Sequence, residues 1–172
     1  MNDTLLTTGR FSVQRRAYSH PTAGVVHREL VVHPGAVVIL PLAEDGTVVL
    51  IRNYRFAVGC ELLELPAGTL EAGEEPIACA ARELEEETGY RAERIVPLAR
   101  FYTSPGFTDE RMHAFVATGL SRTEQRLDVT EQIQVETMPL SDALAATLDG
   151  RIVDGKSIAA LHVYHYGKVM SL

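Results

Sequence analysis

Residues 68–90 read GTLEAGEEPIACAARELEEETGY, and this stretch decides the fold. Pro76 suits the first turn of a helix, where its missing N–H is not needed, and Gly89 suits the left-handed position just past a helix end. The residues between these two signals therefore predict a helix that runs from about Pro76 to Thr88.

The predicted helix has two faces of opposite character. Its apolar positions recur at three- and four-residue spacing and can pack on a sheet; they are Ile77, Ala80, Ala81 and Leu84. Glu83, Glu86 and Glu87 project together from a neighbouring face. Two carboxylates one turn apart repel each other by roughly 0.2–0.5 kcal/mol, and Arg82 alone cannot neutralise three of them. A hard divalent cation can, because it prefers oxygen ligands.

An acidic run on its own is more often a solvated helix face, so the spacing around the glutamates decides their meaning. The fixed positions, with spacers of five, seven, one and one residues between them, are Gly68, Glu74, Arg82–Leu84, Glu86–Glu87 and Gly89. This pattern resembles the signature box of the Nudix hydrolases at every fixed position. Tyr90 is the one departure, since the family usually has an aliphatic residue there.

The resemblance extends along the chain to the ADP-ribose pyrophosphatase branch of that family. Before the box it rests on three segments, which are 33–37 (HPGAV), 52–55 (RNYR) and 61–68 (ELLELPAG). After the box, residues 104–110 (SPGFTDE) are similar to the downstream proline motif of that branch. Such a proline accompanies ADP-ribose and other nucleoside diphosphate sugars as substrates. Asn53 stands where the branch commonly has Gln, which leaves the exact sugar open.

Beyond the helix, the pattern predicts a mixed sheet with helices on both sides. Residues 36–42 and 47–52 flank a Glu-Asp-Gly turn and predict a hairpin in a buried sheet. Further strands are expected at 61–65, 95–102, 112–118 and 133–138. Ser141 is expected to cap a second helix, and residues 157–166 predict a last one. This order agrees with the α/β/α sandwich that the resemblance implies.

Residues 1–35 predict a small N-terminal antiparallel β-sheet extension, ahead of a Nudix hydrolase domain over residues 36–172. Within the extension, residues 11–18 and 25–32 alternate in polarity across a turn-like HPTAG segment. Two strands are not stable alone, so they must pack on something else. The resemblance implies a homodimer in which these strands help to build the substrate pocket; the alternative is packing on their own subunit.

The bulk composition limits the class of protein. The chain has 172 residues, of which 46% are hydrophobic and 23% charged, as in one soluble globular domain. The formal net charge of −7 argues against nucleic acid as a partner. No apolar run approaches the roughly 18 residues of a membrane span, and the first residues lack the apolar core of a signal peptide. We therefore expect a cytoplasmic protein with no nucleic-acid or membrane partner.

The resemblance also implies roles for the residues of the box. Glu83 and Glu87 would ligate the metal directly, and Glu86 would ligate it or orient a bound water. The backbone carbonyl of Ala67 would complete a site. Mg2+ is the expected ion, with Mn2+ as a substitute. Arg82 is expected to orient the glutamates rather than to bind substrate.

The general base is left open by the sequence. In the resembled branch it commonly comes from an acidic loop before a late strand, here residues 126–133 (RLDVTEQI). Glu131 takes the position of a metal-binding glutamate, whereas Val129 stands where a second glutamate often acts as the base. Glu131 is therefore the favoured base, and Asp128 and Glu86 are the alternatives.

Substrate contacts are expected from two further segments. Arg55 can offer forked donors to a phosphate, the alternative being a surface salt bridge. Glu110 can accept hydrogen bonds from the ribose or the terminal sugar. Phe107 can pack on the sugar or merely shape its loop.

These features predict a Mg2+-dependent hydrolase that cuts the pyrophosphate bond of a nucleoside diphosphate sugar, with ADP-ribose giving AMP and ribose 5-phosphate. The charge of a pyrophosphate repels a nucleophile, so its hydrolysis needs cations and a base. The alternatives are GDP-mannose or another nucleoside diphosphate derivative as substrate, or a catalytically silent nucleotide-sugar sensor. The complete glutamate set argues against the sensor, because an acidic cluster without a metal costs stability.

Overall fold

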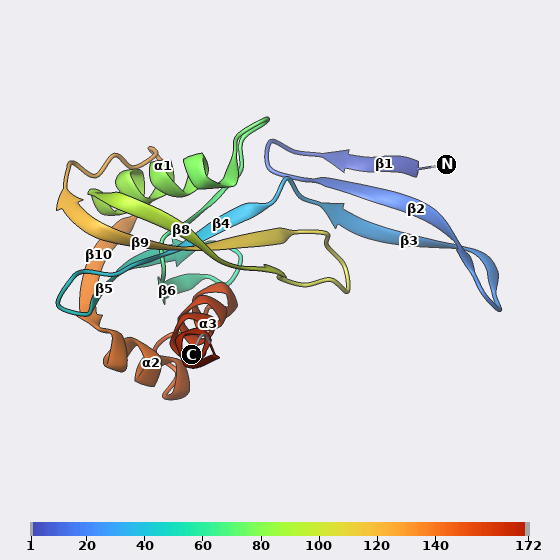
Figure 1. Ribbon diagram of the computed structural model, residues 1–172. Coiled ribbons are helices and arrows are strands. Elements are labelled where there is room, and N and C mark those ends of the chain that lie inside the picture. Colours follow the sequence, from blue (N-terminus) through green and yellow to red (C-terminus); the bar gives the residue numbers. More distant parts are fainter. Residues whose placement is uncertain (1, 171–172) are drawn as a thin grey trace.

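The computed structural model describes residues 2–170, which form a layered body and a projecting arm (Figure 1). The body contains two sheets, with strand orders β7-β4-β9-β8 and β10-β5-β6. Their strands are β4 (Ala36–Pro41), β5 (Thr47–Arg55), β6 (Cys60–Glu64), β7 (Ala67–Thr69), β8 (Tyr90–Tyr102), β9 (Arg111–Arg122) and β10 (Ile133–Pro139). The pair β4–β9 is parallel and the other pairs of these sheets are antiparallel, which confirms the predicted mixed strand arrangement.

Within the described residues, three helices cover the sheets from two sides: α1 (Pro76–Thr88), α2 (Leu140–Leu148) and α3 (Gly155–Met170). Helix α1 lies on one side, and α2 and α3 lie on the other (Figure 1). Strand β4 packs against both sides, because successive side chains of a strand point to opposite faces. Val37 and Ile39 belong to the core under α1, whereas Val38 and Leu40 belong to the core with α2 and α3. The predicted α/β/α sandwich is confirmed.

Helix α1 has the predicted bounds. Pro76 is its first residue, and Gly89 follows it in the left-handed region at φ 66° and ψ 30°. The N–H of Gly89 donates to the carbonyl of Glu85 at 2.9 Å, which satisfies one of the open carbonyls at the helix end. The side chains of Cys79, Ala80 and Leu84 are fully buried against the sheet. The helix is therefore held in place by its apolar face, and its acidic face is free to form a site.

Two predictions about local structure are wrong. Strands β4 and β5 do not form a hairpin, because they lie in different sheets and meet only at a bridge between Leu42 and Val48. Strand β4 and residues 48–51 of β5 are continuous apolar runs, and such runs do not reveal which neighbour they pair with. Ser141 does not cap α2, which begins one residue earlier, after Pro139. Its hydroxyl is bonded to Asp142 instead, at 3.3 Å.

The arm is a three-stranded antiparallel sheet of β1 (Asn2–Thr7), β2 (Ser12–His20) and β3 (Gly24–Val32), in that order. The two predicted strands are confirmed, and β1 is an addition that the sequence did not indicate. The arm extends well beyond the body (Figure 1). No helix within residues 2–170 is long and apolar enough to cross a membrane.

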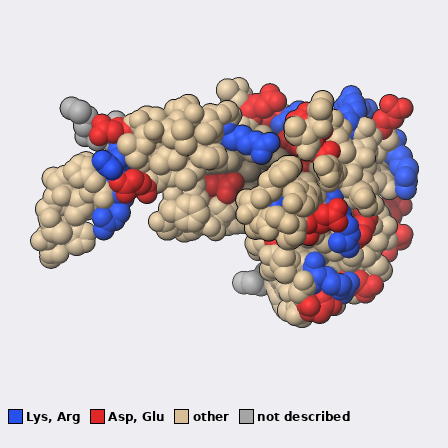
Figure 2. Space-filling view, turned by 180° about the vertical axis from the view of Figure 1, so that it is seen from behind, with Lys and Arg blue, Asp and Glu red and all other residues tan. Residues whose placement is uncertain are grey.

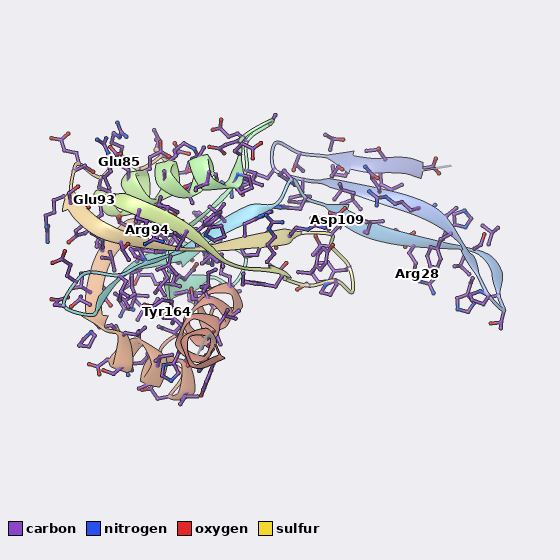
Figure 3. The ribbon with its side chains drawn as sticks, in the orientation of Figure 1. Arg28, Glu85, Glu93, Arg94, Asp109 and Tyr164 are labelled. Carbon is purple, nitrogen blue, oxygen red and sulfur yellow. The ribbon has the colours of Figure 1, made fainter. Side chains whose placement is uncertain are left out.

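The base of the arm is bonded to the loop between β8 and β9. The N–H of Val31 donates to the carbonyl of Phe107 at 2.8 Å, and the N–H of Asp109 donates to the carbonyl of Val31 at 3.2 Å. The carboxylate of Asp109 then accepts the N–H of His33 at 2.9 Å. Figure 3 shows Asp109 at this junction, between the arm and the body. The loop of the proline motif is thus fixed by the arm of its own chain.

Candidate active site

The glutamates of α1 are fixed by the short strand β7. The N–H of Ala67 donates to Glu87 Oε2 at 2.8 Å. The carboxylate of Glu83 lies directly over Gly68, so closely that a Cβ at residue 68 would be 1.9 Å from Glu83 Cδ. Real contacts of that length do not occur, and any side chain at residue 68 would displace Glu83. The glycine of the box is required by this close approach.

Two of the three glutamates are buried. Glu83 is 9% exposed and Glu87 is 3% exposed. Loss of water raises the pKa of both carboxyls, and that of Glu87 reaches about 8, although the Ala67 N–H opposes the shift. Repulsion from Glu83 also raises the pKa of Glu87, and repulsion from Glu86 raises that of Glu83. A bound divalent cation would reverse this effect, because it stabilises the ionised forms.

Arg82 lies among the acidic side chains, as expected. Its Nε and one terminal nitrogen donate to Glu74 at 2.9 and 3.1 Å. Its other terminal nitrogen donates to Glu83 at 2.7 Å and to Glu86 at 3.1 Å. The bond from Arg82 lowers the pKa of Glu74 to about 2. Glu74 also accepts the N–H of Glu71 at 3.0 Å, so Arg82 connects the box loop to the helix.

The donor set fits a hard divalent cation. Glu83, Glu86 and Glu87 offer only oxygen atoms, which Mg2+ and Mn2+ prefer. Within residues 2–170, no three His, Cys, Asp or Glu side chains already stand around a common point. Arg82 is bonded to the carboxylates of Glu83 and Glu86, and the N–H of Ala67 is directed at Glu87. The predicted role of the Ala67 carbonyl as a metal ligand stays a prediction.

The loop with the candidate base reaches the same site. The charge of Glu131 contributes to the raised pKa of both Glu83 and Glu87, so its carboxylate lies within electrostatic range of the cluster. Glu131 Oε2 accepts the N–H of Asp128 at 3.0 Å, and the N–H of Glu131 donates back to the carbonyl of Asp128 at 2.9 Å. Val129 is fully exposed. Glu131 thus lies near the acidic cluster, and Asp128 is bonded to it through backbone groups. Its role as metal ligand and base stays a prediction.

A cavity of about 560 Å³ opens beside the cluster. Arg55 and Glu110, both predicted to bind substrate, line it together with Ala67 and with Gly68, the first residue of the box. Phe107 is 59% exposed and is not among the lining residues. Its backbone carbonyl accepts the N–H of Val31 in the arm, and the packing of its ring on a sugar stays a prediction.

The sequence offered a surface salt bridge as the alternative role of Arg55, but it did not indicate the buried partner Glu64 or the network on the cavity wall. Arg55 donates to Glu64 from Nε at 2.8 Å and from a terminal nitrogen at 2.6 Å. The pairing with Glu64, which is fully buried, raises the pKa of Arg55. Lys156 also donates to Glu64 and pairs with Asp154 at 2.9 Å. One signal in the sequence could have indicated this network. Glu64 stands within the apolar run LLELP, and a charge buried by such a run requires a partner of opposite charge.

The cluster of carboxylates, the glycine beneath it and the adjoining cavity define a metal-assisted hydrolase site on an α/β/α sandwich. Residues 32–161 match the NUDIX domain, and the chain belongs to the Nudix family. The predicted family is confirmed, and with it the class of hydrolases.

Relatives agree with this assignment. The chain is 41% identical over 143 residues to an ADP-ribose pyrophosphatase of Bacillus subtilis, which covers 82% of this chain and 77% of the relative. It is 38% identical over 168 residues to an ADP-ribose pyrophosphatase of Mycobacterium tuberculosis, and this match covers 95% of this chain and 81% of the relative. It is also 37% identical over 142 residues to a GDP-mannose pyrophosphatase of Citrobacter koseri, and this match covers 76% of this chain and 73% of the relative.

A solved structure supports the fold. The chain superimposes on an ADP compounds hydrolase with a TM-score of 0.84, and the match covers 96% of this chain and 90% of the other. The two sequences are 23% identical. This similarity extends over the arm as well as the body.

The buried carboxyl of Glu87 leads to a prediction about stability without metal. In EDTA, Glu87→Gln is expected to be more stable than the unaltered protein at about pH 9, and the difference is expected to vanish toward about pH 5. The pKa of the Glu87 carboxyl is raised from 4.5 to about 8, so the folded protein favours the protonated carboxyl. The stability that this proton provides is complete below pH 4.5 and is lost as the pH rises through 8, where the folded protein must bury a charge. Thermal unfolding across this pH range measures the effect.

Glu124→Gln is the matched control, because Glu124 is exposed. Its unfolding temperature should follow that of the unaltered protein at every pH. A difference between Glu87→Gln and the unaltered protein that is the same at all pH values would contradict the assignment of the raised pKa to Glu87.

Proposed function

We propose that this chain is a divalent-metal-dependent pyrophosphatase of nucleoside diphosphate sugars that splits ADP-ribose into AMP and ribose 5-phosphate. The observation that carries the proposal is the position of Ala67 and Gly68. These two residues contact Glu87 and Glu83 of the acidic cluster and also line the cavity. A substrate in the cavity would therefore place a phosphate next to the metal ligands. The relatives named ADP-ribose pyrophosphatase support the choice of sugar.

The acidic cluster would hold the ion through Glu83, Glu86 and Glu87, with Mg2+ as the expected metal and Mn2+ as its substitute. When bound, the ion would screen the phosphates and make a water molecule more acidic. Arg82 would keep the carboxylates oriented, since it is bonded to both Glu83 and Glu86. Glu131 would accept the proton of the attacking water.

The cavity wall would bind the remainder of the substrate. Glu64 holds Nε and one terminal nitrogen of Arg55, which fixes the plane of the guanidinium. The other terminal nitrogen can then donate to a phosphate oxygen. Glu110 accepts a hydrogen bond from the hydroxyl of Thr103 and has further acceptor capacity for a sugar hydroxyl.

A product assay tests the proposal. With Mg2+, the protein is expected to release AMP from ADP-ribose faster than it releases nucleotides from ADP-glucose, GDP-mannose or UDP-glucose. The activity should be lost in EDTA and in Glu87→Gln. A preference for GDP-mannose would move the substrate toward that of the Citrobacter koseri relative. Tight binding of ADP-ribose without product would instead identify a sensor.

The base assignment has its own test. Glu131→Gln is expected to lower kcat at least about tenfold, at the low end of the usual loss when a general base is removed. Asp128→Asn tests the alternative base in the same turn. Asp128 is bonded to Glu131 through its backbone N–H and carbonyl, so kcat should stay near normal, and a large loss would transfer the role to Asp128. Near-normal kcat in Glu131→Gln, with a large loss in Glu86→Gln, would transfer the role to Glu86.

We also propose that residues 1–35 form a dimerisation element and residues 36–172 the hydrolase domain. The arm exposes apolar side chains, among them Leu5, Leu6, Tyr18 and Val25. Figure 2 shows large uncharged areas on the projecting arm, whereas charged side chains of both signs are spread over much of the body. Such apolar surface on a projecting sheet is typical of a protein interface. A second copy of this chain is the proposed partner.

Sedimentation tests the homodimer. The unaltered protein is expected to have the mass of two chains, and Leu6→Glu combined with Val25→Glu is expected to shift it toward one chain. Both substitutions place a charge where apolar surface would be buried. Leu148→Glu is the control, because Leu148 is 82% exposed on α2 of the body. A monomer at all concentrations of the unaltered protein would refute this assembly.

A further inference from the structure

Residues 123–132, which carry Glu131, form a loop that is tied to the C-terminal end of α1. The N–H of Thr123 donates to the carbonyl of Gly89 at 2.7 Å, and the N–H of Arg126 donates to the carbonyl of Glu86 at 2.9 Å. The last carbonyls of a helix have no partner within the helix and must find one elsewhere. The loop supplies those donors, so its position depends on the helix that carries the acidic cluster.

Gln125 makes the connection that matters most for Glu131. Its side-chain Nε2 donates to the carbonyl of Glu87 at 2.7 Å and lies 3.5 Å from the carbonyl of Ile133. The first bond is short and the second is at the limit of hydrogen-bond length. One amide thus joins the residue that bears a buried carboxylate to the strand that begins two residues after Glu131.

The backbone around Gln125 leaves little freedom. A Cβ on Gly89 would be 3.0 Å from the N atom of Gln125 and 3.2 Å from the carbonyl oxygen of Thr123. Gly89 is also in the left-handed region, at φ 66°. The loop therefore packs directly on the glycine that ends the helix, and the Gln125 side chain reaches the helix from a fixed starting point.

The neighbouring ion pairs cannot replace this connection. Glu85 pairs with Arg126 at 3.1 Å and with Arg91 at 3.0 Å. Figure 3 shows Glu85 on α1, at the edge of the molecule. Both arginine side chains are about two-thirds exposed, and exposed pairs contribute little to stability. Gln125 is also an exposed residue, but its bond to the Glu87 carbonyl is partly buried, whereas the bond between Arg126 and Glu85 is exposed.

We propose that Gln125 is a positioning residue that holds the Glu131 loop against the end of α1, so that the carboxylate of Glu131 faces the acidic cluster. The inference rests on the proposed function, in which Glu131 is the general base. An N–H donor is essential at this position, because both of the groups it meets are carbonyl oxygens. A side chain of the same size without a donor would leave the Glu87 carbonyl unpaired and would free the loop.

Gln125→Met is the first test, because methionine has a similar length but no charge and no N–H. The variant is expected to lower kcat about tenfold, the scale of losing a general base, while KM for ADP-ribose stays within about twofold. Hydrogen exchange at the amides of Arg126 and Glu131 should become faster in the metal-free protein. Gln125→Glu, which also removes the donors, should behave in the same way if the methionine variant fails to fold.

Gln132→Met is the matched control. Gln132 is an exposed glutamine in the same loop, and its side chain makes no hydrogen bond within residues 2–170. Its kcat and its exchange rates should equal those of the unaltered protein. A loss in Gln132→Met as large as that in Gln125→Met would overturn the specific role of Gln125.

A double variant separates positioning from a general structural effect. If Gln125 acts through Glu131, Gln125→Met combined with Glu131→Gln should be no slower than Glu131→Gln alone. If the losses in kcat of the two single variants multiply in the double variant, Gln125→Met acts on the metal-binding helix and the inference is overturned. Unchanged hydrogen exchange in Gln125→Met would overturn it whichever residue is the base. A fully active Glu131→Gln would refute the base assignment of the proposed function and, with it, the catalytic role of Gln125.

Discussion

The close contact between β7 and helix α1 is the constraint on which the site depends. Ala67 bonds to Glu87 and Gly68 makes room for Glu83, so two carboxylates are held where little water reaches them. Burying a charge without a partner costs free energy, and the apolar face of α1 must supply the packing that holds the helix there. The helix therefore stores an unfavourable electrostatic arrangement that a bound cation would relieve.

Strand β4 transmits this constraint to the rest of the body. It pairs with β7 on one edge and with β9 on the other, and it contributes side chains to both cores. The pairing of β4 with β7 fixes the start of the box next to α1. The pairing of β4 with β9 fixes the strand that follows the proline motif. The acidic cluster and the cavity with Glu110 are thus positioned by a single buried strand. The arm adds a further restraint through Asp109, next to Glu110.

The parts that could be predicted from sequence are those encoded locally. Helix α1 was predicted to the residue, because Pro76 and Gly89 mark its ends and its apolar spacing is regular. The division of β4 and β5 between two sheets was not predictable, because strand partners are decided by contacts distant in sequence. The bonds of Gln125 and Lys156 were missed for the same reason. Each joins groups that come together only after folding, and neither residue stands in a recognisable motif.

The two charged networks of the site differ in their net charge. This difference relates metal binding to substrate binding. Arg82 is bonded to three carboxylates, those of Glu74, Glu83 and Glu86, and Glu87 lies beside them. When all four carboxyls are ionised, the cluster has a formal excess of three negative charges. On the cavity wall, two cations, Arg55 and Lys156, meet two carboxylates, Glu64 and Asp154, which leaves none. A neutral network can orient a phosphate through its N–H groups, but it cannot balance the charge of a pyrophosphate. That balance would come from ions held by the acidic cluster, so we expect substrate affinity, and not only turnover, to depend on the metal.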